Sequence, residues 1–399
     1  MNHTLSALHP YPFEKLAALK SGITPPASLE HIPLSIGEPK HTPPAFALEA
    51  ISNNLNALTQ YPLTKGLPEL RQAISHWANT RFNLNNALNF DAQVLPVAGT
   101  REALFAFTQA VIDNTKKTPK VLMPNPFYQI YEGAAIIAGA EPVFLNCTAE
   151  NGFLPDLDSV SAETWQDCQL LFLCSPGNPT GTVMDQAYLI KALELADEHD
   201  FIIASDECYS ELYFDESKPP VGLLEACINS GRADFKNAVV FHSLSKRSNL
   251  PGLRSGFVAG DADVLADFLK YRTYHGCALP VTTQLASIAA WQDETHVKEN
   301  RDLYRQKFTQ VVDILNPVLP VSIPEASFYL WPQTPIADTD FAQGLFAQQN
   351  VTVLPGQFLA RDTATGNPGE NYIRMALVAP VAQCLEAAKR IKAFVESLS

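Results

Sequence analysis

The chain has 399 residues, of which 46% are hydrophobic and 18% are charged, and its formal net charge is −14. This length exceeds the size at which one hydrophobic core stops growing, so two domains are expected, and the composition excludes extensive disorder. The negative charge argues against a general nucleic-acid-binding protein, and the nine histidines and seven cysteines show no spacing typical of a metal site.

The N-terminal residues Met1–Leu16 lack a basic region followed by an apolar run, so no signal peptide is expected. No apolar stretch is long enough to cross a membrane. The odd number of cysteines, without a Cys-x-x-Cys pair, fits buried thiols better than a disulfide framework. We therefore expect a cytoplasmic protein without a membrane partner.

Short apolar runs alternate with helical patterns through the middle of the chain. The expected strands are 120–123, 142–145, 170–174, 201–204, 239–242 and 256–259. The expected helices between them include 101–112, 186–199 and 262–271. This alternation predicts an α/β fold, in which a mostly parallel sheet is covered by helices on both faces. Ligands of such sheets bind at the carboxyl ends of the strands.

After Pro280 the pattern changes to a long helical stretch, from 281 to about 318, followed by a smaller α+β unit. Its expected elements are strands at 326–331, 351–354 and 372–378 and a final helix from 381 to about 397. The first forty-odd residues are rich in proline and resemble an arm plus a short segment of the smaller unit. We therefore expect residues 48–283 to form a large domain, and residues 1–47 and 284–399 to form the arm and a small domain.

The segment 243–256 carries the most informative chemistry. Lys246 lies among the hydroxyl residues Ser243 and Ser245, and Arg254 follows in a glycine-containing turn. A lysine can form a Schiff base with an aldehyde cofactor, and hydroxyls and a guanidinium can hold its phosphate by bonds worth roughly 1.5–3 kcal/mol each. Taken alone, the segment also fits a solvated surface loop.

Two further segments follow predicted strands and can bind the ring of such a cofactor. Asp206 can keep a pyridine nitrogen protonated, and the ring then acts as an electron sink. Tyr209 and Asn178 can hydrogen-bond the phenolic oxygen of the ring. Each also has an ordinary structural explanation, because Asp often caps helices and Pro-Gly-Asn-Pro is common in turns.

Two more segments complete the pattern. The residues Thr100, Arg101 and Glu102 open a helix after Gly99, and backbone N–H groups at a helix N-terminus bind phosphate. Tyr128 follows another strand end and can stack on a flat ring, although a core position would equally suit it.

In this order and spacing, these residues resemble the class I/II pyridoxal-phosphate aminotransferases of fold type I, across nearly the whole chain. The resemblance implies a covalent aldimine between pyridoxal 5′-phosphate and Lys246, with a sheet of the seven-stranded type. It also implies that Lys246, Asp206 and Tyr209 are catalytic. The cofactor-binding residues that it implies are Tyr61, Thr100, Arg101, Glu102, Tyr128, Asn178, Asp206, Tyr209, Ser243, Ser245, Lys246 and Arg254.

The family resemblance also assigns substrate contacts and an assembly. Arg374 and Gly37 match the positions that bind the substrate α-carboxylate, with Asn178 beside them. Tyr61 matches a tyrosine that reaches the cofactor phosphate of the other subunit, which implies a homodimer with shared active sites.

Several loops are similar to those of the N-succinyldiaminopimelate aminotransferases: 10–13, 36–41, 124–133, 243–261, 271–276 and 366–370. This similarity implies a role in bacterial diaminopimelate and lysine biosynthesis, with glutamate and 2-oxoglutarate as the second substrate pair. Such a substrate carries remote carboxylates, so a second cation is expected. Arg101 is the first candidate, because a related bacterial subgroup has a distal-carboxylate lysine there, and Lys40, Lys65 and Arg247 are further candidates.

Three alternative functions use the same sequence features. An aspartate- or aromatic-type aminotransferase would differ in its side-chain pocket, and a carbon–sulfur β-lyase would share Lys246, Asp206 and Arg374. A ligand-sensing domain of a regulator is disfavoured, because the lysine is present and no DNA-binding segment precedes it.

Overall fold

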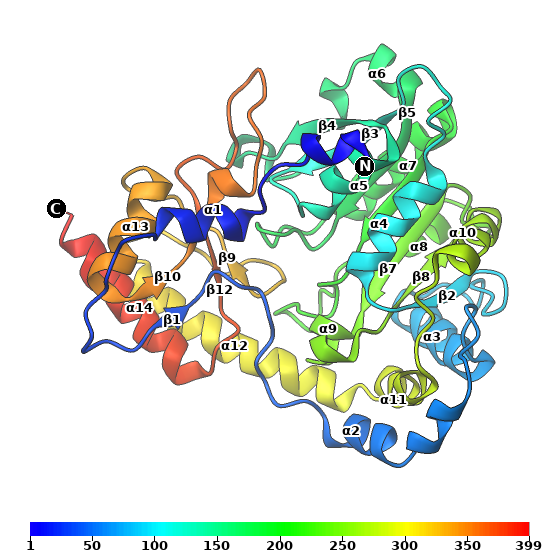
Figure 1. Cartoon of the computed structure of the whole chain (residues 1–399), viewed down its shortest axis with the longest axis horizontal. Helices are drawn as coiled ribbons and strands as arrows, with labels where there is room; N and C mark the ends of the chain where they lie inside the picture. Colours follow the sequence, from blue (N-terminus) through cyan, green and yellow to red (C-terminus); the bar gives the residue numbers. More distant parts are fainter. Residues whose placement is uncertain (399) are drawn as a thin grey trace.

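The computed structural model describes residues 1–398 and is built around a seven-stranded sheet (Figure 1). The strand order is β2-β8-β7-β6-β5-β3-β4. Only β8 runs antiparallel to its neighbours, so the expected mostly parallel sheet is confirmed. The strands are β2 (Val94–Val97), β3 (Lys120–Asn125), β4 (Glu141–Asn146), β5 (Cys168–Cys174), β6 (Ile202–Asp206), β7 (Ala238–Ser243) and β8 (Gly256–Gly260).

The sequence analysis did not anticipate β2. Its Pro96 cannot donate a ladder hydrogen bond, which argues against a central strand. In the structure β2 is an edge strand that pairs only with β8, with Pro96 opposite Phe257. The missing N–H is therefore tolerated.

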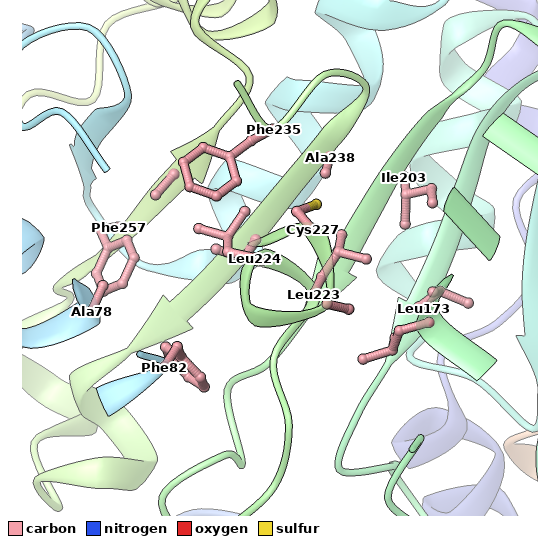
Figure 2. Packing of buried hydrophobic residues seen from close by; sticks show 14 of the residues in the cluster. Ala78, Phe82, Leu173, Ile203, Leu223, Leu224, Cys227, Phe235, Ala238 and Phe257 are labelled. Carbon is pink, nitrogen blue, oxygen red and sulfur yellow. The ribbon is translucent and has the colours of Figure 1, made fainter. Parts of the chain in front are cut away.

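Helices cover both faces of this sheet (Figure 1). Along β5, Leu170 and Phe172 pack into one core, and Leu171 and Leu173 pack into the other. The first core is closed by α4 (Thr100–Val111), α5 (Ile130–Ala138) and α10 (Ala262–His275). The second is closed by α3 (Pro68–Arg81), α7 (Gln186–His199), α8 (Leu223–Asn229) and α11 (Val281–Gln292). Figure 2 shows part of the second core, where side chains of α8 lie against β6, β7 and β8.

The smaller α+β unit has its own core. It contains the antiparallel sheet β11-β12-β9 (Leu354–Pro355, Ile373–Ala376 and Tyr329–Leu330) and the helices α12 (Thr295–Leu315), α13 (Asp338–Gln349) and α14 (Val381–Glu396). In the N-terminal segment, β1 (Ile32–Pro33) pairs with β10 (Val351–Thr352) of this unit. The remaining helices are α1 (Pro12–Leu19), α2 (Ala45–Ser52), α6 (Ala162–Asp167) and α9 (Leu244–Arg247).

The expectation of one helical stretch from 281 to about 318 was wrong, because the stretch breaks between α11 and α12. Asp293 has an extended backbone there, with φ −112° and ψ 125°. Its side chain accepts a hydrogen bond from the His296 N–H at 2.9 Å. A short polar side chain thus satisfies an amide at the start of α12, which stabilises the break. No helix within residues 1–398 is long and apolar enough to cross a lipid bilayer.

Candidate active site

One cavity of about 380 Å³ lies at the carboxyl ends of β5, β6 and β7. Every residue that the family resemblance implies for the site lines it, except Tyr61. The lining also includes residues from the N-terminal segment and from the smaller unit, such as Tyr11, Glu38 and Tyr329. The site therefore joins three parts of the chain that are distant in sequence.

Lys246 lies on the single-turn helix α9, directly after β7. The Ser243 hydroxyl caps this helix by accepting a hydrogen bond from the Ser245 N–H at 3.1 Å. The Lys246 ammonium donates to the Gly37 carbonyl at 2.6 Å and lies 5.1 Å from the Phe328 ring centroid. Burial lowers the Lys246 pKa to about 8, so the free amine is far more populated near neutral pH than in an ordinary lysine.

Asp206 ends β6 and is 5% exposed. Its carboxylate accepts hydrogen bonds from the Tyr131 hydroxyl at 2.8 Å and the Cys208 N–H at 3.2 Å. Burial raises its pKa, and these hydrogen bonds oppose that rise. No cation forms an ion pair with Asp206 among the described residues, so its carboxylate is available to pair with a positively charged nitrogen of a ligand.

The N-terminus of α4 forms one end of the cavity. Gly99 precedes it with φ +97°, and a Cβ there would lie 2.1 Å from Nη2 of Arg254. The absence of that Cβ lets the guanidinium approach the unpaired first amides of the helix. Nη2 of Arg254 donates to Glu102 at 2.7 Å. Together with Ser243 and Ser245, these donors have the chemistry of a phosphate site.

Arg374 lies elsewhere in the cavity and is 5% exposed. Its Nη1 donates to Asn178 Oδ1 at 3.0 Å and its Nη2 to the Ser35 carbonyl at 2.8 Å. Its Nε finds no hydrogen-bond partner within residues 1–398. A guanidinium has five N–H donors, so several remain for a ligand carboxylate.

Gly37 and Tyr329 sit against each other beside this arginine. A Cβ on Gly37 would lie 2.1 Å from the Tyr329 hydroxyl oxygen, so the close approach requires glycine. The Tyr329 hydroxyl is 3.1 Å from the Tyr209 hydroxyl, and its ring centroid is 4.5 Å from the Arg374 guanidinium. Tyr329 escaped the sequence analysis, which assigned 326–331 only as a strand.

Arg101 occupies the mouth of the cavity. Its Nε donates to the Tyr128 hydroxyl at 2.8 Å, and its Nη2 donates to the Tyr11 hydroxyl at 3.0 Å. Burial raises the Tyr128 pKa, so this phenol stays neutral. Arg101 therefore keeps its positive charge next to two neutral partners. Tyr11 was not predicted as a site residue, because no local pattern shows where an irregular arm will fold.

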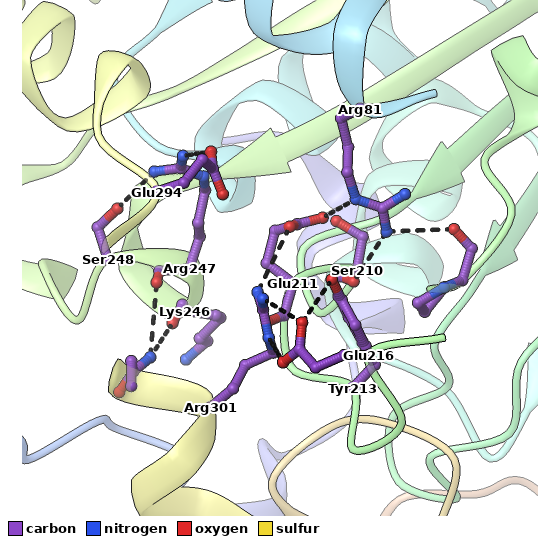
Figure 3. Close-up of polar contacts among 12 residues, drawn as sticks. Arg81, Ser210, Glu211, Tyr213, Glu216, Lys246, Arg247, Ser248, Glu294 and Arg301 are labelled. Atoms are coloured by element: carbon purple, nitrogen blue, oxygen red, sulfur yellow. Dashed lines mark hydrogen bonds and ion pairs between the residues drawn. The ribbon is translucent and has the colours of Figure 1, made fainter. Parts of the chain in front are cut away.

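Three other candidate cations for a remote carboxylate lie outside the cavity. Lys65 pairs with Asp91 at 2.9 Å, and Lys40 lines a different cavity. The Arg247 guanidinium is buried, pairs with Glu294 and donates to the Ala290 carbonyl at 2.7 Å. Figure 3 shows Arg247 directed toward Glu294. Arg247 is thus committed elsewhere, whereas the proposed substrate roles of Lys40 and Lys65 stay predictions.

A partly buried ionic cluster braces the loop that follows β6. Glu211 accepts from Arg81 at 2.8 Å, and Arg301 of α12 pairs with Glu216 at 2.9 Å (Figure 3). The neighbouring arginines lower the Glu211 pKa against the effect of burial, so it stays ionised. Within the part of the chain that the structure describes, no three His, Cys, Asp or Glu side chains gather as metal ligands.

Tyr61 lies outside the cavity, with its side chain fully exposed. Leu58 and Leu63 beside it are also exposed, by 62% and 73%. The predicted role of Tyr61 in the site of another subunit stays a prediction.

Comparison with known proteins gives a consistent result. The family model described as aminotransferase class I and II matches residues 30–391. An LL-diaminopimelate aminotransferase of Maridesulfovibrio salexigens is 32% identical over 395 residues, which cover 97% of each chain.

Two solved structures extend this comparison. A Neisseria meningitidis aminotransferase shares 50% identity with a TM-score of 0.94, covering 98% of this chain and 99% of that one. A probable N-succinyldiaminopimelate aminotransferase of Thermus thermophilus shares 26% identity with a TM-score of 0.82, covering 96% of this chain and 100% of that one.

Proposed function

The chain belongs to the class I and II aminotransferases, and we propose that its amino donor is N-succinyl-LL-2,6-diaminopimelate and its acceptor 2-oxoglutarate. The family transfers amino groups between amino acids and keto acids with pyridoxal phosphate, held covalently by a lysine. One observation carries the choice of substrate. Arg101 and Arg374 line the same cavity, and neither is neutralised by a carboxylate of the described residues.

We assign the cofactor to the cavity because its donor set fits that group. The first amides of α4, the hydroxyls of Ser243 and Ser245, and Arg254 would hold the phosphate. Asp206 would stabilise a protonated ring nitrogen, Tyr128 would lie on the ring face, and Asn178 and Tyr209 would bind the phenolic oxygen. When bound, pyridoxal phosphate supplies an electron sink for removal of the substrate Cα proton.

The residues of the chain then have separate tasks. Lys246 would hold the cofactor and, once displaced by the substrate amine, would remove the proton from the substrate Cα. Its lowered pKa keeps the free base available near neutral pH. Arg374 would fix the α-carboxylate of the reacting amino acid, which orients the Cα–H bond toward Lys246.

The proposed pair of substrates suits one pocket with two arginines. Both the succinylated donor and 2-oxoglutarate carry a carboxylate next to the reacting carbon and another further away. Arg374 would bind the near group and Arg101 the remote group in both half-reactions. The same side chains therefore serve the forward and the return steps.

Free LL-diaminopimelate is a second candidate, and one residue favours it. Glu38 lines the cavity, is exposed, and forms no ion pair or side-chain hydrogen bond within the described residues. It could pair with the remote ammonium of the free diamine, which succinylation converts to a neutral amide. Relatives that are 30–32% identical carry the name LL-diaminopimelate aminotransferase.

Single-turnover absorbance with the cofactor-loaded protein tests these candidates. Bleaching of the cofactor band by N-succinyl-LL-diaminopimelate, reversed by 2-oxoglutarate, is the expected result. Faster bleaching by free LL-diaminopimelate would move the assignment to that substrate. Glu38→Gln should then slow the reaction with the free diamine and leave the reaction with the succinylated donor unchanged. Bleaching mainly by aspartate would reject both, and pyruvate release from cystathionine would indicate a β-lyase.

We also propose a homodimer in which Tyr61 reaches the phosphate of the neighbouring active site. The exposed side chains of Leu58, Tyr61 and Leu63 form an apolar surface that supports this proposal. Analytical ultracentrifugation should show a dimer. Tyr61→Phe should weaken cofactor binding while the protein remains a dimer. A monomer with full activity would contradict the proposal.

A further inference from the structure

A chain of hydrogen bonds lies behind the lysine loop, outside the cavity lining. Asn300 of α12 donates through Nδ2 to the backbone carbonyl of Lys246 at 3.2 Å. Asn300 Oδ1 lies 2.6 Å from His41 Nδ1, and His41 Nε2 lies 2.6 Å from Lys307 Nζ. Lys307 also donates to the Leu377 carbonyl at 3.0 Å. Asn300 and Lys307 are buried, at 6% and 1% exposed, whereas His41 is half-buried, and all three line a second cavity that also includes Lys40.

The chemistry of the groups fixes the direction of each bond. The Asn300 carbonyl oxygen can only accept, so His41 Nδ1 must carry a hydrogen. His41 Nε2 is then unprotonated and accepts from the Lys307 ammonium. Burial and the neighbouring Lys307 lower the His41 pKa to about 4, which keeps the imidazole neutral in this arrangement.

This chain of hydrogen bonds connects Lys246 and Arg374, the two charged residues proposed to act on the substrate and to bind it. One end holds the backbone of Lys246, and the other holds Leu377, which directly follows the strand β12 that carries Arg374. His41 belongs to the segment that also offers the Gly37 carbonyl to the Lys246 ammonium and the Ser35 carbonyl to Arg374.

We infer that His41 is a positioning residue for amino transfer, because it fixes the backbone of Lys246 relative to the strand of Arg374. The Lys246 ammonium must leave the Gly37 carbonyl when it reacts, whereas the His41 chain holds the backbone and can stay intact. A misplacement of about 1 Å costs on the order of 10²-fold in rate, so this connection matters for turnover. The inference needs only the family reaction and does not depend on the donor proposed above.

Two substitutions at one position separate positioning from simple packing. His41→Phe keeps a ring that can pack against Tyr304, whose ring centroid lies 4.6 Å away, but it removes both hydrogen bonds. His41→Gln keeps one donor and one acceptor. Lys307→Met breaks the other end of the chain and serves as an independent variant if His41→Phe fails to fold.

Each cofactor-loaded variant is mixed with saturating donor, using the donor that reacts fastest with the unmodified protein. In His41→Phe we expect the limiting single-turnover rate to fall by about 10- to 100-fold, with the apparent donor dissociation constant changed less than about twofold. His41→Gln should recover most of the rate. Amide hydrogen exchange of the segment 244–250 should become faster in His41→Phe and Lys307→Met, but not in His41→Gln.

The His41→Phe/Lys307→Met double variant provides the final comparison. If the groups act as one chain, the double variant should be no slower than the slower single variant. Equal losses in His41→Phe and His41→Gln, an unchanged rate in Lys307→Met, or additive losses in the double variant would each overturn the inference. These outcomes differ from a failed substrate assignment, which would change the donor that reacts fastest with the unmodified protein but would leave the relative rates of the variants unchanged.

Discussion

The two ends of the cavity use the same side chain in different ways. Arg254, at the proposed phosphate end, pairs with Glu102, whereas Arg101, at the mouth, is held by the neutral phenols of Tyr11 and Tyr128. A phosphate dianion has several other donors at its end and can displace a carboxylate partner. A single substrate carboxylate has fewer donors to bind it. Its arginine therefore binds it more strongly when no protein carboxylate competes for the guanidinium.

The largest loss of activity should come from substitution of Lys246. Lys246→Ala should still bind pyridoxal phosphate, because both ends remain intact, but it should lose about 10²–10⁴-fold in turnover as the positioned base disappears. Absorbance after gel filtration measures bound cofactor, and steady-state assays measure turnover. Near-normal turnover would place the reacting lysine elsewhere.

The two substrate arginines should differ in selectivity. Arg374→Ala should lower kcat/KM for every amino acid, whereas Arg101→Ala should raise KM only for substrates with a remote carboxylate. Charge-assisted hydrogen bonds of about 1.5–3 kcal/mol correspond to roughly 10- to 150-fold in each case. Alanine is the control substrate, and an equal effect of Arg101→Ala on alanine and on dicarboxylates would remove Arg101 from the substrate site.

The rate at which pyridoxal phosphate attaches to the protein should depend on pH through the lowered pKa of Lys246. Only the free amine attacks the aldehyde, and its folded-state pKa is about 8 in place of 10.5. The attachment rate of the cofactor-free protein should therefore rise about tenfold between pH 7 and 9 and then level off. A rate that still rises steeply to pH 10 would indicate an unperturbed lysine.

The smallest effect should come from the carboxylate that distinguishes the two ends. Glu102→Gln would release Arg254 from an exposed ion pair, and such pairs contribute about 0.2–1 kcal/mol. Pyridoxal phosphate should therefore bind about two- to fivefold more tightly, as measured by equilibrium dialysis. Arg254→Gln is the matched variant and should weaken binding. Weaker binding in Glu102→Gln would mean that Glu102 positions the arginine.

The proposed cofactor end could be predicted from sequence because its residues follow buried strands. Asn178, Asp206 and Ser243 each come at or just after a strand end, and parallel strands bring such ends together. The mouth of the cavity could not be predicted in the same way. Tyr11 reaches the mouth from the arm, and Glu38 and Tyr329 reach other parts of the cavity from the N-terminal segment and the smaller unit, so their placement depends on tertiary packing.

Two errors in the predicted fold also have physical causes. Pro96 concealed the edge strand β2, because proline suggests a non-strand segment unless one side of the strand lacks a neighbour. The junction between α11 and α12 was overlooked because the helical pattern continues on both sides of Asp293. The lysine loop was recognised more readily, since its residues are contiguous.

The antiparallel strand β8 has a mechanical consequence for this loop. Ser243 at the end of β7 pairs directly with Gly256 at the start of β8, so two hydrogen-bonded neighbours close the loop that carries Lys246 and Arg254. A Cβ on Gly256 would lie 2.4 Å from the His242 carbonyl, so this close approach of the two strands requires glycine. Lys246 and Arg254 therefore share one loop that the sheet closes at its base, and the hydrogen bonds through Asn300, His41 and Lys307 tie the same loop to the strand of Arg374.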